Sequence, residues 1–236
     1  MTAGYRPPGV ADRGTAIVLL SGGLDSATVL AIAHAEGWAC RALTLRYGQR
    51  HSREIEAAKR LARAMDLPEH RRVSLDLAAW GGSSLTGDGE VPHGGVTAEA
   101  IPSTYVPARN TVLLSLALAW AEAIGAQAIF LGVSAVDYSG YPDCRPEFIA
   151  AFQQLANVAT KVGLAGRAPV LRAPLINKSK AETIRWGAAL GVDYALTWSC
   201  YDPTPAGRPC GDCDSCRLRA KGFADAGMVD PLVSAD

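Results

Sequence analysis

The sequence has no surplus of either charge, because 23 lysines and arginines are balanced by 23 aspartates and glutamates. Proteins that bind nucleic acids or membrane surfaces usually carry a basic surplus, so this balance argues against both partners. The apolar run at residues 112–121 ends before Glu122 and is too short to span a bilayer. Residues 1–16 contain no apolar stretch typical of a signal peptide. We therefore expect a soluble, cytoplasmic protein with no nucleic-acid or membrane partner.

A glycine-rich turn follows the first apolar run of the chain. Residues 16–20 predict a buried strand, residues 25–36 predict a helix, and the turn between them reads SGGLDS. Backbone N–H groups and the helix dipole favour an anion at such a helix start. Gly22 and Gly23 allow phosphate oxygens to come close to the backbone, and Asp25 implies a Mg²⁺ ion beside them. No Lys follows the glycines, so the turn is not the P-loop of kinases and GTPases.

Apolar runs and helical spacings predict strands and helices that alternate along the chain. The predicted strands lie at residues 16–20, 41–47, 71–75, 128–133 and 170–174. The predicted helices lie at residues 25–36, between Ser52 and Pro68, at 108–124, from Pro146 onward, and at 179–190. This alternation predicts an α/β fold with a doubly wound parallel sheet and ligands at the carboxyl ends of the strands. Residues 78–101 are rich in glycine and predict a long mobile loop.

Four of the six cysteines lie close together near the C-terminus, at positions Cys200, Cys210, Cys213 and Cys216. A cytoplasmic chain rarely contains disulfides, so this spacing predicts a metal site. Four thiolates suit Zn²⁺, although the C-x2-C-x2-C spacing also occurs in iron–sulfur ligand sets. With either metal the site is structural, since four protein ligands leave no open position for catalysis.

Several polar stretches lie where predicted strands end or helices begin. They read YGQRH at 47–51, STYVPARN at 103–110, DYSGYPDCRP at 137–146 and NKSK at 177–180. The SGGxDS turn is similar to the signature of the PP-loop ATP pyrophosphatases, which bind the pyrophosphate of ATP and transfer AMP to a substrate oxygen. Together with the cysteines, these stretches resemble the 7-cyano-7-deazaguanine synthase family of queuosine biosynthesis, from residue 16 to the region of Cys216.

The resemblance implies an ATP-dependent C–N ligase that converts 7-carboxy-7-deazaguanine and ammonia to the nitrile base. The acid is adenylated and aminated to an amide, and a second activation of the amide gives the nitrile. The implied cofactors are ATP, Mg²⁺ and Zn²⁺, and the implied assembly is a homodimer. The implied fold is the Rossmann-type fold of adenine nucleotide alpha-hydrolases over residues 15–195, after a disordered lead-in at 1–14 and before a small zinc-binding segment at 196–236.

The resemblance also assigns roles to residues at the nucleotide. Contacts with ATP are expected from Leu19, Leu20, Ser21, Gly22, Gly23, Leu24, Asp25, Ser26, Ala27, Thr28 and Val29. Asp25 places Mg²⁺, while Lys178 and Lys180 supply positive charge to the phosphates. Arg109 makes a bidentate contact with a phosphate or with the substrate carboxylate. The alternative for the lysines is a solvated helix start, and for Arg109 an exposed position.

The substrate base is assigned to a second group of residues. Asp137 and Asp143 accept hydrogen bonds from its guanine-like edge, and Tyr138, Tyr141 and Phe148 stack on its face. The aspartates could equally be turn residues, and Phe148 could equally belong to the core. Gln49 and His51 are expected to border the nucleotide, with a solvated position as the alternative for His51.

Three rival functions share parts of this pattern. A tRNA-thiolating PP-loop enzyme with an iron–sulfur cluster has the same turn and cysteines, but RNA binding favours a basic stripe that is missing here. A glutamine-dependent amidotransferase with an N-terminal cysteine is disfavoured, because Thr2 follows Met1. A zinc-binding interaction protein would not need Asp25 in a phosphate turn. Colour separates the first rival, since an iron–sulfur protein is brown and a zinc protein is colourless.

Overall fold

The computed structural model describes residues 11–87, 89–93, 101–136 and 140–233. Its strands and helices, in chain order, are β1 (Thr15–Leu19), α1 (Leu24–Ala35), β2 (Ala39–Arg46), α2 (Arg53–Ala64), β3 (His70–Ser74), α3 (Arg109–Ile124), β4 (Ala128–Phe130), α4 (Pro146–Ala159), α5 (Lys161–Leu164), β5 (Val170–Arg172), α6 (Lys180–Ala189) and α7 (Asp214–Ala226). In this described part of the chain, no helix is both long and apolar enough to cross a membrane.

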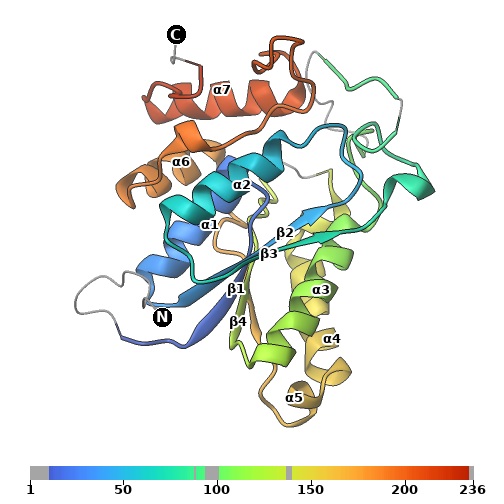
Figure 1. The fold of residues 1–236 in the computed structure, drawn as a ribbon, viewed down its shortest axis with the longest axis vertical. Coiled ribbons are helices and arrows are strands. Elements are labelled where there is room, and N and C mark those ends of the chain that lie inside the picture. The colour runs from blue at the N-terminus through green and yellow to red at the C-terminus, as the bar shows by residue number, and fades with distance from the viewer. Residues whose placement is uncertain (1–10, 88, 94–100, 137–139, 234–236) are drawn as a thin grey trace.

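The five strands form one parallel sheet in the order β3-β2-β1-β4-β5. The chain moves outward from β1 to β3 and then returns to the other side of β1 for β4. Helices α1 and α2 cover one face and α3 and α4 the other, while α6 packs on α1 and α7 on α6 (Figure 1). The direction of winding therefore reverses between β1 and β4, which confirms the doubly wound α/β fold.

The central strand shows why the sheet is buried on both sides. Ala16 and Val18 pack in the cluster formed with α1 and α2, and Ile17 and Leu19 pack in the cluster formed with α3. Successive side chains of a strand point to opposite faces, so a strand covered by helices on both sides is apolar at every position. The continuous run at residues 16–20 is the sequence signature of that burial.

Two predicted strands are longer than the observed ones. β4 ends at Phe130 and β5 at Arg172, where the predictions ran to residues 133 and 174. The Leu131 N–H still donates to the Arg172 carbonyl oxygen at 3.0 Å. Beyond this bond, the apolar residues after β4 line a pocket, so they are buried without continuing the ladder.

The sequence patterns missed α5 and α7. In the described part of the loop at residues 78–101, Leu85 and Val91 are buried beside Leu45 and Trp198, so this segment contributes to the core, and its predicted mobility stays a prediction. Residues 94–100 of this loop, and residues 1–10 of the predicted lead-in, lie outside the described residues. At the end of the lead-in, Arg13 donates from its N–H to the Gly37 carbonyl at 3.3 Å.

Candidate active site

The turn between β1 and α1 is shaped by its contact with α2. Gly22 has a φ of +94°, in the left-handed region that favours glycine. A Cβ at Gly22 would lie 2.1 Å from the Glu54 carbonyl oxygen and 2.8 Å from the Ala58 nitrogen. The Ser26 Oγ accepts from the Gly22 N–H at 3.2 Å and donates to the Gly23 carbonyl at 3.0 Å. The polypeptide alone therefore fixes this turn, and the start of α1 presents its first backbone N–H groups there.

A pocket of about 1230 Å³, including the space at its mouth, opens at the carboxyl ends of β1 and β4. This is the reversal point of the sheet, where doubly wound folds bind their ligands. A Cβ at Gly132, just after β4, would lie 3.0 Å from the Asp25 carbonyl carbon, so glycine lets the end of β4 approach the first turn of α1. Polar side chains enter the pocket from α2, α3, α6 and the C-terminal segment, among them Glu54, Arg109, Asn110, Lys180, Ser199, Tyr201 and Arg219.

Asp25 and Lys180 form an ion pair at the floor of this pocket. The Lys180 Nζ lies 2.8 Å from both carboxylate oxygens of Asp25. Lys180 is 8% exposed, so the pair is held in a partly dry environment where its charges interact strongly. Because Asp25 lies in the first turn of α1 and Lys180 begins α6, the pair joins two helices whose N-termini both favour anions.

Lys178, two residues earlier, has a different environment. Its Nζ pairs with the Glu182 carboxylate at 3.1 Å, and the side chain is 41% exposed. Glu182 also accepts from the backbone and hydroxyl of Ser179, which completes a capping box at the start of α6. These hydrogen bonds from Ser179, with the charge of Lys178, lower the pKa of Glu182 to about 2.

Arg109 enters the pocket from the first residue of α3. Its Nη1 donates to the Tyr47 hydroxyl at 3.2 Å, and its guanidinium lies 5.6 Å from the centre of the Tyr47 ring. Tyr141 also lines the pocket, with its hydroxyl 2.6 Å from the Thr104 Oγ1. Burial raises the pKa of both Tyr47 and Tyr141, so both phenols stay neutral. The guanidinium is thus positioned by neutral aromatic groups.

Asp143 orients the start of α3. Its Oδ2 accepts from the Asn110 backbone N–H at 2.9 Å, and the Asn110 Nδ2 donates to the Asp143 carbonyl at 2.9 Å. A carboxylate at a helix start satisfies N–H groups that have no partner within the helix. Asp143 therefore fixes the residue next to Arg109, and it is not among the residues that line the pocket.

Glu54 is a pocket residue that the sequence patterns did not single out. It lies in the first turn of α2, and its carboxyl group faces the same pocket as Arg109. Burial raises the pKa of Glu54 to about 7, although the positive charge of Arg109 opposes the rise. The stretch YGQRHSREIEAA drew attention to Gln49 and His51, but only the tertiary fold distinguishes Glu54 from other glutamates near helix starts.

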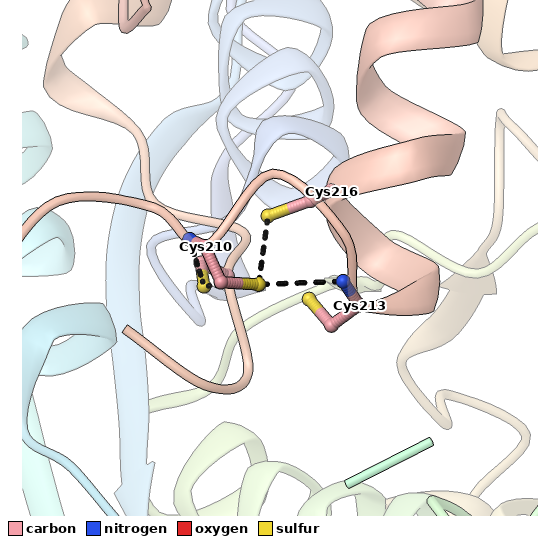
Figure 2. Close-up of side chains that lie close together, drawn as sticks. Cys210, Cys213 and Cys216 are labelled. Atoms are coloured by element: carbon pink, nitrogen blue, oxygen red, sulfur yellow. Dashed lines mark hydrogen bonds between the residues drawn. The ribbon is translucent and has the colours of Figure 1, made fainter. Parts of the chain in front are cut away.

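The four clustered cysteines converge as a ligand set. Their Sγ atoms all lie within 4.8 Å of one another. The Sγ of Cys210 is 3.6 Å from that of Cys200 and 3.9 Å from that of Cys216 (Figure 2). A tetrahedral zinc ion with Zn–S bonds of about 2.3 Å requires sulfur separations of about 3.8 Å, so the donor set fits Zn²⁺. The Cys213 N–H donates to the Cys210 Sγ at 3.3 Å.

The cysteine segment is attached directly to the turn. The Trp198 N–H donates to the Gly22 carbonyl oxygen at 2.9 Å, and the Trp198 ring lines the pocket. Further along, the buried Arg219 of α7 pairs with Asp230 at 2.6 Å and donates to the Thr197 Oγ1 at 2.7 Å. The C-terminal segment is therefore one wall of the pocket.

Not all predicted site residues meet in this pocket. Leu19, Leu20, Ser21, Gly23, Leu24, Asp25, Ser26, Arg109, Tyr141 and Lys180 line it. Ala27, Thr28 and Val29 are buried in α1, and the Thr28 Oγ1 is 2.8 Å from the Tyr194 hydroxyl. Phe148 packs against Phe152, with ring centres 6.1 Å apart.

Two further predicted residues lie beside this pocket, and two fall outside the described residues. Gln49 and His51 line a second, neighbouring pocket, where the His51 ring lies 6.3 Å from the Trp198 ring. Asp137 and Tyr138 lie outside the described residues. The sequence patterns also missed Trp198 and Tyr201, which lie between the predicted elements and the cysteine motif and carry no periodic signal.

Comparison with known proteins matches residues 15–227 to the family described as queuosine biosynthesis protein QueC. The chain is 61% identical over 220 residues to the 7-cyano-7-deazaguanine synthase of Paramagnetospirillum magneticum, covering 92% of this chain and 96% of that protein. It is 60% identical over 217 residues to the enzyme of the same name from Magnetococcus marinus, covering 92% of this chain and 95% of that protein.

Among solved structures, one similar fold is that of a 4-thiouridine synthetase in complex with RNA and with bound ATP. The TM-score is 0.52 at 16% sequence identity, covering 91% of this chain and 50% of that chain. At this identity the similarity concerns the fold alone.

Proposed function

Because the chain belongs to the QueC family of queuosine biosynthesis proteins, we propose that it converts 7-carboxy-7-deazaguanine and ammonia to 7-cyano-7-deazaguanine at the expense of ATP. The observation that carries the proposal is the identity of about 60% across nearly the full length of synthases with this activity in their names. The SGGLDS turn at the floor of a large pocket supports the use of ATP.

The chemistry explains the need for ATP. A carboxylate reacts poorly with ammonia because its oxygen is a poor leaving group. Transfer of AMP to that oxygen releases pyrophosphate, and ammonia then displaces AMP to give the amide. A second AMP transfer to the amide oxygen makes it a leaving group again, and its departure with AMP leaves the nitrile.

Residue roles follow from the pocket. Ser21, Ser26 and the backbone of Gly22 and Gly23 hold the pyrophosphate. Lys180 and Arg109 place positive charge near the phosphates, where charge develops during transfer. Lys178 is not among the residues that line the pocket and pairs with Glu182 outside it, which argues against a phosphate contact for Lys178.

Asp25 is the residue that would hold Mg²⁺, together with oxygen atoms of ATP itself. Such an ion commonly has only one or two protein carboxylates among its ligands, and it would supply charge neutralisation at the phosphates. Among the residues predicted to stack on the substrate base, Tyr141 lines the pocket, which supports a contact of Tyr141 with the base.

Zn²⁺ is the proposed occupant of the cysteine cluster, with a structural role. The sulfur separations of 3.6 and 3.9 Å support this metal. Through Trp198, the cluster would hold the wall of the pocket against the phosphate turn.

We further propose a cytoplasmic homodimer that works without nucleic acid. The zero net charge supports the absence of a nucleic-acid partner. Leu155, Val158 and Leu164 are exposed on α4 and α5, which supports a self-contact on that side of the molecule.

The test is incubation of the protein with ATP, Mg²⁺, ammonium and 7-carboxy-7-deazaguanine, followed by mass spectrometry. We expect the amide and then the nitrile, with AMP rather than ADP as the nucleotide product. A mixture without either product would refute the activity. A brown protein with bound iron would favour the tRNA-thiolating alternative.

A further inference from the structure

Glu54 lies beside the phosphate turn. Its carbonyl oxygen is the atom that prevents a Cβ at Gly22, with a separation of 2.1 Å. Glu54 lines the pocket that also contains Ser21, Asp25 and Arg109, and its carboxyl group is close enough to Arg109 for the guanidinium charge to act on its pKa. A carboxyl group on the first turn of α2 therefore faces the space where an adenylated substrate would lie next to the turn.

Several other titratable groups of this pocket are paired or neutral, which makes them poor bases. Asp25 is bound to Lys180 through both of its oxygens. Burial raises the pKa of the Cys144 thiol to about 12, and the phenols of Tyr47 and Tyr141 are also kept neutral.

Glu54 differs from these groups in its surroundings. Among the described residues that face it, the charged group is Arg109 of α3, whose guanidinium donates to the Tyr47 hydroxyl. The same guanidinium lies 5.6 Å from the centre of the Tyr47 ring. Burial raises the pKa of Glu54 to about 7, which lies near neutral pH, where a general base is most effective.

Nitrile formation needs a base at the nitrogen atom. Ammonia that attacks the acyl adenylate carries protons that the amide does not keep, and the amide nitrogen then loses both remaining protons on the way to the nitrile. Resting on the function proposed above, we propose that Glu54 is the general base that takes these protons from the substrate nitrogen.

The elimination step balances as follows. The Glu54 carboxylate takes the last proton from the nitrogen of the adenylated imidate, and the N–H electron pair becomes the second π bond between carbon and nitrogen. The bond between carbon and the oxygen of AMP breaks at the same time, and AMP leaves with that electron pair. Protonated Glu54 then returns its proton to water.

The test separates adenylation from proton removal. Adenylation is measured as the exchange of labelled pyrophosphate into ATP in the presence of 7-carboxy-7-deazaguanine. In E54Q, we expect the rate of this exchange to stay within about threefold of the native rate, because adenylation does not need the base. Conversion of the amide to the nitrile should fall roughly 100-fold or more, the usual range for loss of a general base. The acid limb of the native pH profile for this step, with an apparent pKa near 7, should disappear.

Two further variants provide controls. E54D keeps a carboxylate and should restore part of the nitrile rate, and it serves as the measured variant if E54Q does not fold. E56Q changes the next glutamate of α2, which pairs with Lys59 and is outside the pocket lining, and it should behave as the native protein.

The outcomes distinguish the two proposals. A nitrile rate in E54Q within threefold of native, or an equal loss in pyrophosphate exchange and nitrile formation, would overturn the role of Glu54. If the native protein forms neither AMP nor nitrile, the proposed function itself fails.

Discussion

The phosphate turn and the cysteine cluster are both compact sites, but they are built in opposite ways. The turn is made of backbone, and its shape is fixed by the packing of Gly22 against the first turn of α2. The cluster is made of four side chains that have no reason to converge on their own, because thiolates repel one another without a cation. The fold alone therefore determines the shape of the phosphate turn. The shape of the cysteine cluster should depend on the bound metal as well as on the fold.

The hydrogen bond from Trp198 to Gly22 joins these two sites. A substitution in the cysteine cluster should disturb the pocket, because the C-terminal segment forms one of its walls. A substitution in the phosphate turn should leave metal binding by the cluster unchanged. Four experiments test this asymmetry.

The largest effect is expected from loss of the metal. C213S, or treatment with a strong chelator, should abolish stoichiometric zinc binding and make residues 196–233 sensitive to protease, since structural zinc contributes roughly 10 kcal/mol or more. Far-UV circular dichroism should keep most of the signal of the sheet and its helices. C40S is the matched control, because Cys40 is buried far from the cluster. If C213S were as resistant to protease as the native protein, the structure of the C-terminal segment would not depend on the metal.

The next largest effect is expected from G22A. The new methyl group would meet two backbone atoms of α2 in a left-handed conformation, which should lower the free energy of unfolding by about 4 kcal/mol or abolish ATP binding. G125A is the control, since Gly125 has a φ of +67° but nothing within 4 Å of a Cβ, and it should cost only about 1 kcal/mol. Urea denaturation measures both. Zinc content should stay native in G22A, and its loss would contradict the asymmetry.

A third effect concerns the buried ion pair that anchors α7. R219M removes one partner of the pair with Asp230, whose side chains are 5% and 9% exposed, and should destabilise the protein by about 3–4 kcal/mol. R217M removes the exposed pair with Asp212, whose arginine is 49% exposed, and should change stability by less than about 1 kcal/mol. Equal urea midpoints for the two variants would show that α7 is not anchored through Arg219.

The smallest effect is a pH dependence at the turn. The pKa of Glu54 rises from 4.5 to about 7 on burial, so the folded protein keeps a proton that the unfolded chain loses in this interval. The contribution of Glu54 to stability is therefore fully present below pH 4.5 and is lost as the pH rises through 7.

Such a shift corresponds to about 3 kcal/mol, and partial exposure of the side chain reduces this to about 1–2 kcal/mol. The urea midpoint of E54Q should therefore match that of the native protein at pH 5 and exceed it at pH 8. A constant difference across this range would show that Glu54 does not titrate on burial.

The features that the sequence predicted are local ones. The strand at residues 16–20, the turn after it and the helix start at Ser179 depend on neighbours within a few residues, so their patterns are visible in the chain. The cysteine cluster could be predicted because its ligands lie within 17 positions of one another.

The features that the sequence did not predict depend on distant contacts. Lys178 and Lys180 look equivalent in the motif, but only Lys180 faces inward from α6 to meet Asp25, while Lys178 pairs with Glu182. The sequence suggested that Asp143 accepts hydrogen bonds from the substrate. In the structure, its carboxylate accepts from the backbone N–H of Asn110 at the start of α3. Glu54 is unremarkable as a glutamate, and its raised pKa exists only because the fold buries it.

The bond between Trp198 and Gly22 also has a consequence for the order of synthesis. The turn leaves the ribosome among the first residues of the domain, but Ser199, Tyr201 and Arg219 of its pocket leave among the last. A nascent chain that ends before residue 196 has the phosphate turn and all five strands of the sheet, but it lacks one wall of the pocket. Translation thus delays a complete pocket until the segment that contains Arg219 has been made.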